Sequence, residues 1–104
     1  MASGILGQAA VSDGSVENVY TVPATMVTAC SINIVNVGNI AANVYVAFSD
    51  DANENQPEYF EYASPLMPSE VLERTGIVIQ AGKNVLVRSE GGTLNVTVYG
   101  YEEV

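Results

Sequence analysis

Few side chains in this sequence could take part in catalysis. The 104 residues contain no histidine and a single cysteine, Cys30. Ser-His-Asp catalysis, Cys-His catalysis and every zinc site that needs histidine are therefore excluded. Neither a GxxxxGKS or GxxxxGKT sequence nor a GxGxxG sequence occurs, so no phosphate-binding loop is predicted. We expect a protein that is not an enzyme and that carries no cofactor and no resident metal.

One acidic stretch, residues 50–58, resembles part of a calcium-binding loop. The sixth position of that pattern is Gln56 instead of glycine, and the twelfth is Tyr62 instead of glutamate. Both the sharp turn and the bidentate acid are thus missing. A solvated acidic loop is the favoured interpretation, and binding of calcium or a glycan is the alternative. The residues at the first, third and fifth positions are Asp51, Asn53 and Asn55.

Aromatic and methionine side chains indicate either ordinary core packing or contact with another protein. Tyrosine and methionine are enriched at the centres of protein interfaces, and this chain has six tyrosines. They are densest over residues 59–67, and a strand can bury only one face of such a group. Two bulky aliphatic residues near the start have no local strand pattern to bury them. The candidate contact residues are Ile5, Leu6, Tyr59, Phe60, Tyr62, Leu66 and Met67.

The charge balance limits the classes of partner. Twelve acidic residues against three basic ones give a net charge of −9. Affinity for nucleic acid comes largely from Lys and Arg that neutralise phosphates, so a nucleic-acid partner is disfavoured. No stretch approaches the roughly 18 consecutive apolar residues of a membrane span. The start of the sequence lacks the charged residues and apolar run of a secretion signal, so synthesis in the cytoplasm is expected.

The last third of the chain, residues 73–103, organises the predicted fold. Short alternating runs of β-branched residues bounded by glycine are typical of hairpins. Three such runs occur there, and we predict a three-stranded antiparallel meander in which Gly91 and Gly92 set the register of the last hairpin. The proposed core residues of this meander are Ile77, Ile79, Val87, Val96 and Val98.

The middle of the chain predicts a second hairpin. Alternating apolar residues over Met26–Val37 and over Ala42–Ser49 indicate two strands, joined by a loop around Gly38. Shorter strands are expected at 19–22 and 59–62. The residues of the hairpin that are expected to face inward are Cys30, Ile32, Ile34, Val44, Val46 and Phe48.

The whole chain therefore predicts an all-β protein. Seven or eight short strands without a helical period indicate a single antiparallel β-sandwich, either immunoglobulin-like or jelly-roll-like. We expect this domain to cover residues 16–104. Residues 1–15 are small and almost uncharged, and they are predicted to form an extended N-terminal arm that docks on a neighbouring chain.

The order of motifs resembles that of small virion proteins of tailed bacteriophages. The residues that carry the resemblance are Ile5-Leu6-Gly7-Gln8, Tyr20-Thr21-Val22-Pro23, Asn36-Val37-Gly38, Leu72-Glu73-Arg74-Thr75-Gly76-Ile77, Ala81-Gly82 and Val98-Tyr99-Gly100-Tyr101-Glu102. Lys83 departs from the pattern, because an acidic or polar residue is expected at that turn. The resemblance implies a non-catalytic β-sandwich attached to the capsid or the tail, and it assigns no functional residues.

These expectations lead to three candidate functions. The first is a capsid decoration (cement) protein that binds the outside of a phage head, with the major capsid protein or another virion protein as its partner. A homo-oligomer or a contact with neighbouring copies on the particle is also expected. The second is a tail, baseplate or fibre-associated adaptor of the same virion. The third is a carbohydrate-binding β-sandwich. For the first two, the protein is expected to be made in the host cytoplasm and assembled on the virion.

Overall fold

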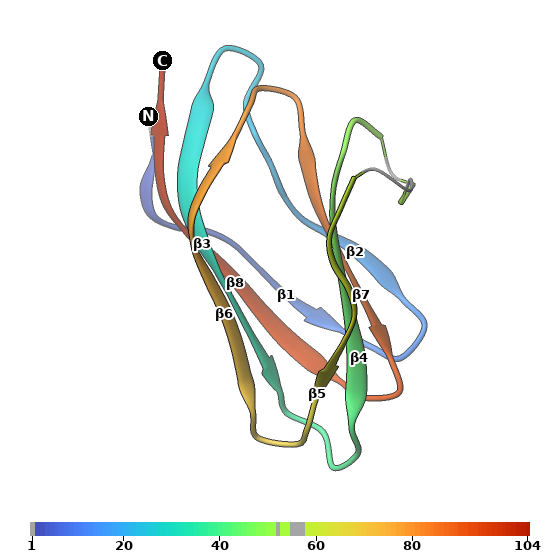
Figure 1. The fold of residues 1–104 in the computed structure, drawn as a ribbon. Coiled ribbons are helices and arrows are strands. Elements are labelled where there is room, and N and C mark those ends of the chain that lie inside the picture. Colours follow the sequence, from blue (N-terminus) through green and yellow to red (C-terminus); the bar gives the residue numbers. More distant parts are fainter. Residues whose placement is uncertain (1, 52, 55–57) are drawn as a thin grey trace.

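Two four-stranded antiparallel sheets pack face to face (Figure 1). The computed structural model describes residues 2–51, 53–54 and 58–104. Sheet A has the strand order β1-β8-β3-β6 and sheet B the order β2-β7-β4-β5. The strands are β1 (Ser3–Val11), β2 (Val16–Thr21), β3 (Val27–Asn36), β4 (Ala42–Ser49), β5 (Tyr59–Leu66), β6 (Val71–Ile79), β7 (Asn84–Glu90) and β8 (Leu94–Glu103).

The connections between strands identify the type of sandwich. Every connection except the one from β4 to β5 crosses from one sheet to the other. Eight strands connected in this way form a jelly roll. The immunoglobulin arrangement, which groups its strands differently, does not apply to this chain.

The same crossings correct two predicted pairings. The predicted meander is wrong, because β6 and β8 lie in sheet A and β7 lies in sheet B. The predicted hairpin of β3 and β4 is wrong for the same reason. Gly91 and Gly92 therefore belong to a crossover between the sheets and do not set a hairpin register. A glycine-rich connection can form either a hairpin within one sheet or a crossover between the two sheets. In this protein it forms a crossover, and each strand buries its apolar face against the opposite sheet.

The predicted inward faces are confirmed for most of the core. All five residues proposed for the last third are buried, and so are the inward residues proposed for β3. Phe48 is half-buried and packs against the same core. Within the described chain the completely buried aliphatic side chains include Val11, Val44, Val85, Val87, Leu94 and Val98. Cys30 is a buried free thiol, and burial raises its pKa.

The predicted N-terminal arm is an edge strand. β1 pairs with β8 along its length, from Ser3 opposite Tyr101 to Val11 opposite Leu94. Its backbone also approaches β2 in the other sheet so closely that a Cβ at Gly7 would lie 2.2 Å from the carbonyl oxygen of Val19. Residues 3–11 are therefore an integral part of the sandwich. No helix long and apolar enough to cross a membrane occurs among the described residues.

Candidate functional site

The predicted contact residues do not form one surface, because some lie in the core and others lie on separate parts of the exterior. Leu66 is buried in the core, and Leu6 packs against that core half-buried. The side chain of Leu66 is therefore not available to a partner, and that of Leu6 is available only in part. Phe60 stacks against Phe48 at the open edge between β5 and β6, with 5.1 Å between ring centroids. Met67 is exposed in the turn that follows β5.

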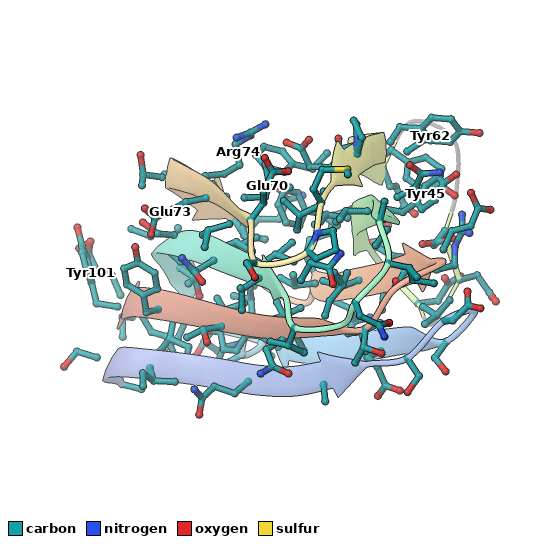
Figure 2. All side chains as sticks on the ribbon, turned by 90° about the horizontal axis from the view of Figure 1, so that it is seen from below. Tyr45, Tyr62, Glu70, Glu73, Arg74 and Tyr101 are labelled. Carbon is teal, nitrogen blue, oxygen red and sulfur yellow. The ribbon has the colours of Figure 1, made fainter. Side chains whose placement is uncertain are left out.

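Tyr59 and Tyr62 belong to an aromatic cluster on the outside of sheet B. Tyr62 meets both Tyr59 and Tyr45 edge to face, with ring centroids 4.9 and 5.1 Å apart. The guanidinium of Arg88 lies 3.8 Å from the centre of the Tyr45 ring. These rings mostly contact one another, although Tyr62 remains 63% exposed (Figure 2).

Two of the three basic side chains pair with the acidic stretch beside this cluster, and the third pairs with Glu61 in β5. The Nε atom of Arg88 donates to Glu54 at 2.9 Å, and Lys83 lies 3.1 Å from Asp50. Lys83 also lies 3.9 Å from Glu58, and Arg74 forms an ion pair with Glu61 at 2.7 Å. The sequence has only these three cations. In the part of the chain that the structure describes, no acidic side chain outside residues 50–61 forms an ion pair with a basic side chain.

The calcium interpretation gains no support from the described part of the loop. The carboxylate of Asp51 accepts hydrogen bonds from the amide of Asn53 and the hydroxyl of Ser49. Asn55 and Gln56, which complete the pattern, lie outside the described residues. Within the described residues, no three His, Cys, Asp or Glu side chains are placed to hold a metal ion.

The outer face of sheet A carries an apolar band that crosses all four strands. The register places Ser3, Tyr101, Ala29 and Val78 in one row. The adjacent row holds Ile5, Tyr99 and Ser31, next to a bulge in β6. Ile5 is 63% exposed, Tyr101 49% and Val78 71%. The next row along the strands is polar throughout, with Gln8, Thr97, Asn33 and Glu73.

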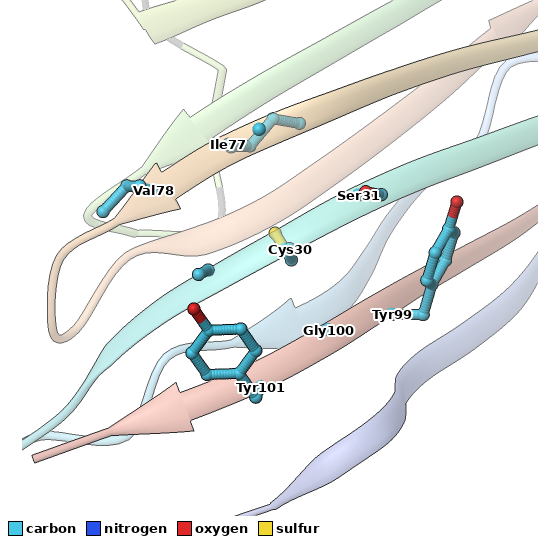
Figure 3. A pocket seen from close by; sticks show the side chains of 9 residues that line it. Cys30, Ser31, Ile77, Val78, Tyr99, Gly100 and Tyr101 are labelled. Atoms are coloured by element: carbon cyan, nitrogen blue, oxygen red, sulfur yellow. The ribbon is translucent and has the colours of Figure 1, made fainter.

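A hollow of about 300 Å³ lies over the middle of this band. Figure 3 shows Tyr99 and Tyr101 on β8, Ser31 on the adjacent β3 and Val78 on β6. Gly100 and Gly76 line the bottom of the hollow, where neither contributes a side chain that would fill it. The hydroxyl of Tyr99 donates to the Oε2 atom of Glu73 at 2.6 Å, which fixes the ring at the border of the band.

A second apolar surface lies at the end of the sandwich opposite the chain termini (Figure 1). The loops after β3 and β5 meet there, and the completely buried side chain of Asn36 joins them. Its amide nitrogen donates to the carbonyls of Ile40 and Leu66 at 2.9 and 3.0 Å. Its oxygen accepts from the amide of Gly38. The loops expose Val37, Ile40 and Met67 by more than half, and so does Val71 at the start of β6.

A buried polar cluster anchors the termini beneath the other end of sheet A. The hydroxyl of Tyr20 donates to Glu102 at 2.5 Å and lies 2.7 Å from the hydroxyl of Thr28. The amide nitrogen of Ala2 donates to the other oxygen of Glu102 at 3.2 Å. Burial and then the bond to Glu102 raise the pKa of Tyr20 to about 12. The bonds from Tyr20 and Ala2 lower the pKa of Glu102.

This cluster predicts a loss of stability in alkali. Unfolded tyrosine titrates near pH 10, so above about pH 10 the unfolded chain releases a proton that native Tyr20 keeps until about pH 12. The free energy of unfolding should fall by about 2–3 kcal/mol over this interval. Urea unfolding at several pH values checks it. Tyr20→Phe should show a correspondingly shallower fall, and an equal fall in both proteins would contradict the assignment.

At low pH the sign for Glu102 is reversed. Its pKa is lowered in the native state, so its contribution is present above the unfolded value of about 4.3 and is lost as the pH falls through the native value.

Of the residues in the apolar band, sequence reasoning selected only Ile5 as a contact. Tyr99 and Tyr101 could have been predicted to point outward, because they alternate along β8 with the inward residues and lie on the same face as Asn95 and Thr97. The outward direction of Val78 also follows from alternation with the predicted core residues Ile77 and Ile79, but its place beside Tyr101 depends on the strand order. The gathering of these residues follows from the strand order, which brings β1, β8, β3 and β6 together.

Comparison with protein-family models, with curated proteins and with solved structures finds no match for this chain. Its function is therefore argued from its own fold and surface.

Proposed function

We propose that this chain is a non-catalytic structural protein of a tailed-phage virion, which decorates the outer surface of the head and binds the shell protein. The sequence resemblance described above supports this function. The jelly roll is also an architecture used by viral capsid proteins, and this support is an analogy at the level of the fold.

The observation that carries the proposal is the distribution of charge. Each of the three basic side chains is held by an acid within residues 50–61, so the remaining exterior carries acidic, neutral polar and apolar side chains. A protein with a net charge of −9 is repelled by packaged DNA. A position on the outside of the shell avoids that repulsion, and the exposed apolar side chains provide the contact.

Particles produced without this chain test the proposal directly. Heads assembled from a phage genome that lacks its reading frame are incubated with the purified protein and imaged. The expected result is added density at regular positions on the head. Density at the tail or baseplate would favour the adaptor function instead, and particles that take up no protein would overturn both. Binding to a glycan array without binding to particles would favour the carbohydrate function.

A further inference from the structure

We propose that the apolar band of sheet A is the docking surface for an extended segment of the partner, with apolar residues at its centre and Lys or Arg on both sides. The identification of that partner as a shell protein rests on the proposed function. The shape and charge of the band determine the chemistry of the segment.

The band has the features of a contact surface and not of an ordinary solvated sheet face. A strand that borders water normally places polar side chains outward, as the adjacent row of Gln8 and Thr97 does. Val78 instead exposes 71% of its surface beside a hollow of about 300 Å³. Tyrosine is enriched among the residues that dominate binding energy. Tyr101, whose hydroxyl has no hydrogen-bond partner in the described chain, is placed to contact the partner directly.

Local backbone geometry opens the hollow. In β6 the pairing with β3 shifts between Ile77 and Arg74, which leaves Thr75 and Gly76 as a bulge. In β8, Gly100 lies against the backbone of Ala29 and Cys30. A side chain at Gly100 would not fit there. Both strands therefore lower the surface at the same place, between the two tyrosine rings.

Carboxylates flank the band on both sides along the strand direction. Glu103 lies one row beyond Tyr101, in the row of Val27, and Glu73 lies in the row of Asn33. The Val27 and Asn33 rows are about 20 Å apart, since each residue of a strand advances about 3.3 Å. An extended segment with basic residues six positions apart spans that distance. The three basic side chains of this chain are instead paired with acids of residues 50–61.

Charge also argues against a second copy of this chain on the band. Each copy carries a net charge of −9, and a face-to-face pair would bring Glu73 and Glu103 toward the acids of the other copy. Like charges placed opposite one another suppress association. The partner must therefore supply the positive charge.

The first test compares two exposed tyrosines on different sheets. Tyr101 lies in the band, and Tyr62 lies on β5, well separated from it (Figure 2). Tyr101→Ala should weaken binding to the heads about tenfold, whereas Tyr62→Ala should bind like the natural protein. Val78→Ser, at a side chain that is 71% exposed, provides a second band variant if Tyr101→Ala is poorly folded. Loss of binding with Tyr62→Ala alone would overturn the assignment.

The second test does not require particles, so it separates this inference from the proposed function. The probe is the capped peptide Lys-Ser-Leu-Ser-Leu-Ser-Lys, titrated into the isotope-labelled protein and followed by amide chemical shifts. Shift changes are expected at Ala29, Ser31, Val78 and Tyr101, and they should weaken with added salt and with Glu103→Gln. The control peptide has glutamate in place of each lysine and should give none.

The outcomes of the two tests are distinct. Peptide binding at the band, together with heads that take up no protein, would refute the proposed function and retain the docking surface. Equal chemical-shift changes with both peptides would overturn the inference, and so would shift changes confined to the aromatic cluster on the outside of sheet B. A dimer in sedimentation that Tyr101→Ala dissociates would also overturn it, by assigning the band to a second copy.

Discussion

Gly100→Ala is expected to destabilise the protein by at least about 3 kcal/mol, a large part of the 5–15 kcal/mol that is typical of a domain. Gly100 has a φ of +150°, and a Cβ there would lie 2.2 Å from the carbonyl oxygen of Ala29 and 2.6 Å from the Cα of Cys30. These are backbone atoms of the central strand β3, so relief requires the β3–β8 pairing to move. Urea unfolding monitored by circular dichroism measures the change.

Gly82→Ala is the matched control. Gly82 also has a positive φ, +83°, but a Cβ there would meet nothing within 4 Å. Its substitution therefore retains the cost of the left-handed conformation, about 1–2 kcal/mol, and omits the clash. The difference between the two variants measures the close approach of β8 to β3. If the two variants were equally stable, close packing at Gly100 would not be the cause of the loss.

Asn36→Asp is expected to destabilise the protein by about 3–5 kcal/mol at neutral pH, because it buries an unpaired charge. The change keeps the shape of the side chain. It replaces the amide nitrogen, which donates to the carbonyls of Ile40 and Leu66, with an oxygen that faces both of them. Both loops of the apolar end surface would lose their shared support. The free energy of unfolding is compared with that of Asn95→Asp, an exposed site where the change should stay within about 0.5 kcal/mol.

The pH dependence of the Asn36→Asp variant provides an independent check. A carboxyl that is buried among carbonyl oxygens has a pKa raised above its unfolded value of about 3.9. The folded variant therefore binds the proton more tightly than its unfolded chain. Relative to the natural protein it should recover stability below about pH 4 and lose it as the pH rises through the native pKa. A loss that does not change with pH would contradict the buried charge.

These two substitutions affect the apolar band, which we propose as the docking surface, and the apolar surface at the end of the sandwich. Gly100 forms part of the floor of the hollow in the apolar band, and Asn36 fixes the loops that expose Ile40 and Met67. Both surfaces depend on buried backbone contacts made by residues that would not themselves touch a partner. We therefore propose that the contact surfaces are rigid before a partner binds, which reduces the conformational entropy lost on binding.

The face that each strand buries could be predicted from the sequence alone. Side chains alternate along a strand whatever its neighbours are, so the inward positions of Cys30, Ile32 and Ile34 follow from local pattern. The same holds for Val96 and Val98. The all-β class and the sandwich followed in the same way, from short β-branched runs.

The pairing of the strands was decided by tertiary structure. Glycine-containing turns such as Gly91–Gly92 occur both in hairpins and in crossovers, so β7 and β8 could not be assigned to different sheets from their connection. The burial of Tyr45 could not be predicted from the sequence either. Strand alternation in β4 predicts that its side chain points outward, and yet it is buried beneath Tyr59 and Arg88. The N-terminal strand could not be predicted for a related reason, since its pairing partner β8 lies at the other end of the sequence.

The apolar band belongs to this second group of features. Ile5, Tyr101 and Val78 are far apart in the sequence, and each alone resembles a scattered exposed apolar residue. They become one surface because β1, β8, β3 and β6 lie side by side in a register that aligns them. That register depends on how both sheets bury their inner faces together. Local alternation determines which way a side chain points, and only the packed sandwich determines what lies beside it.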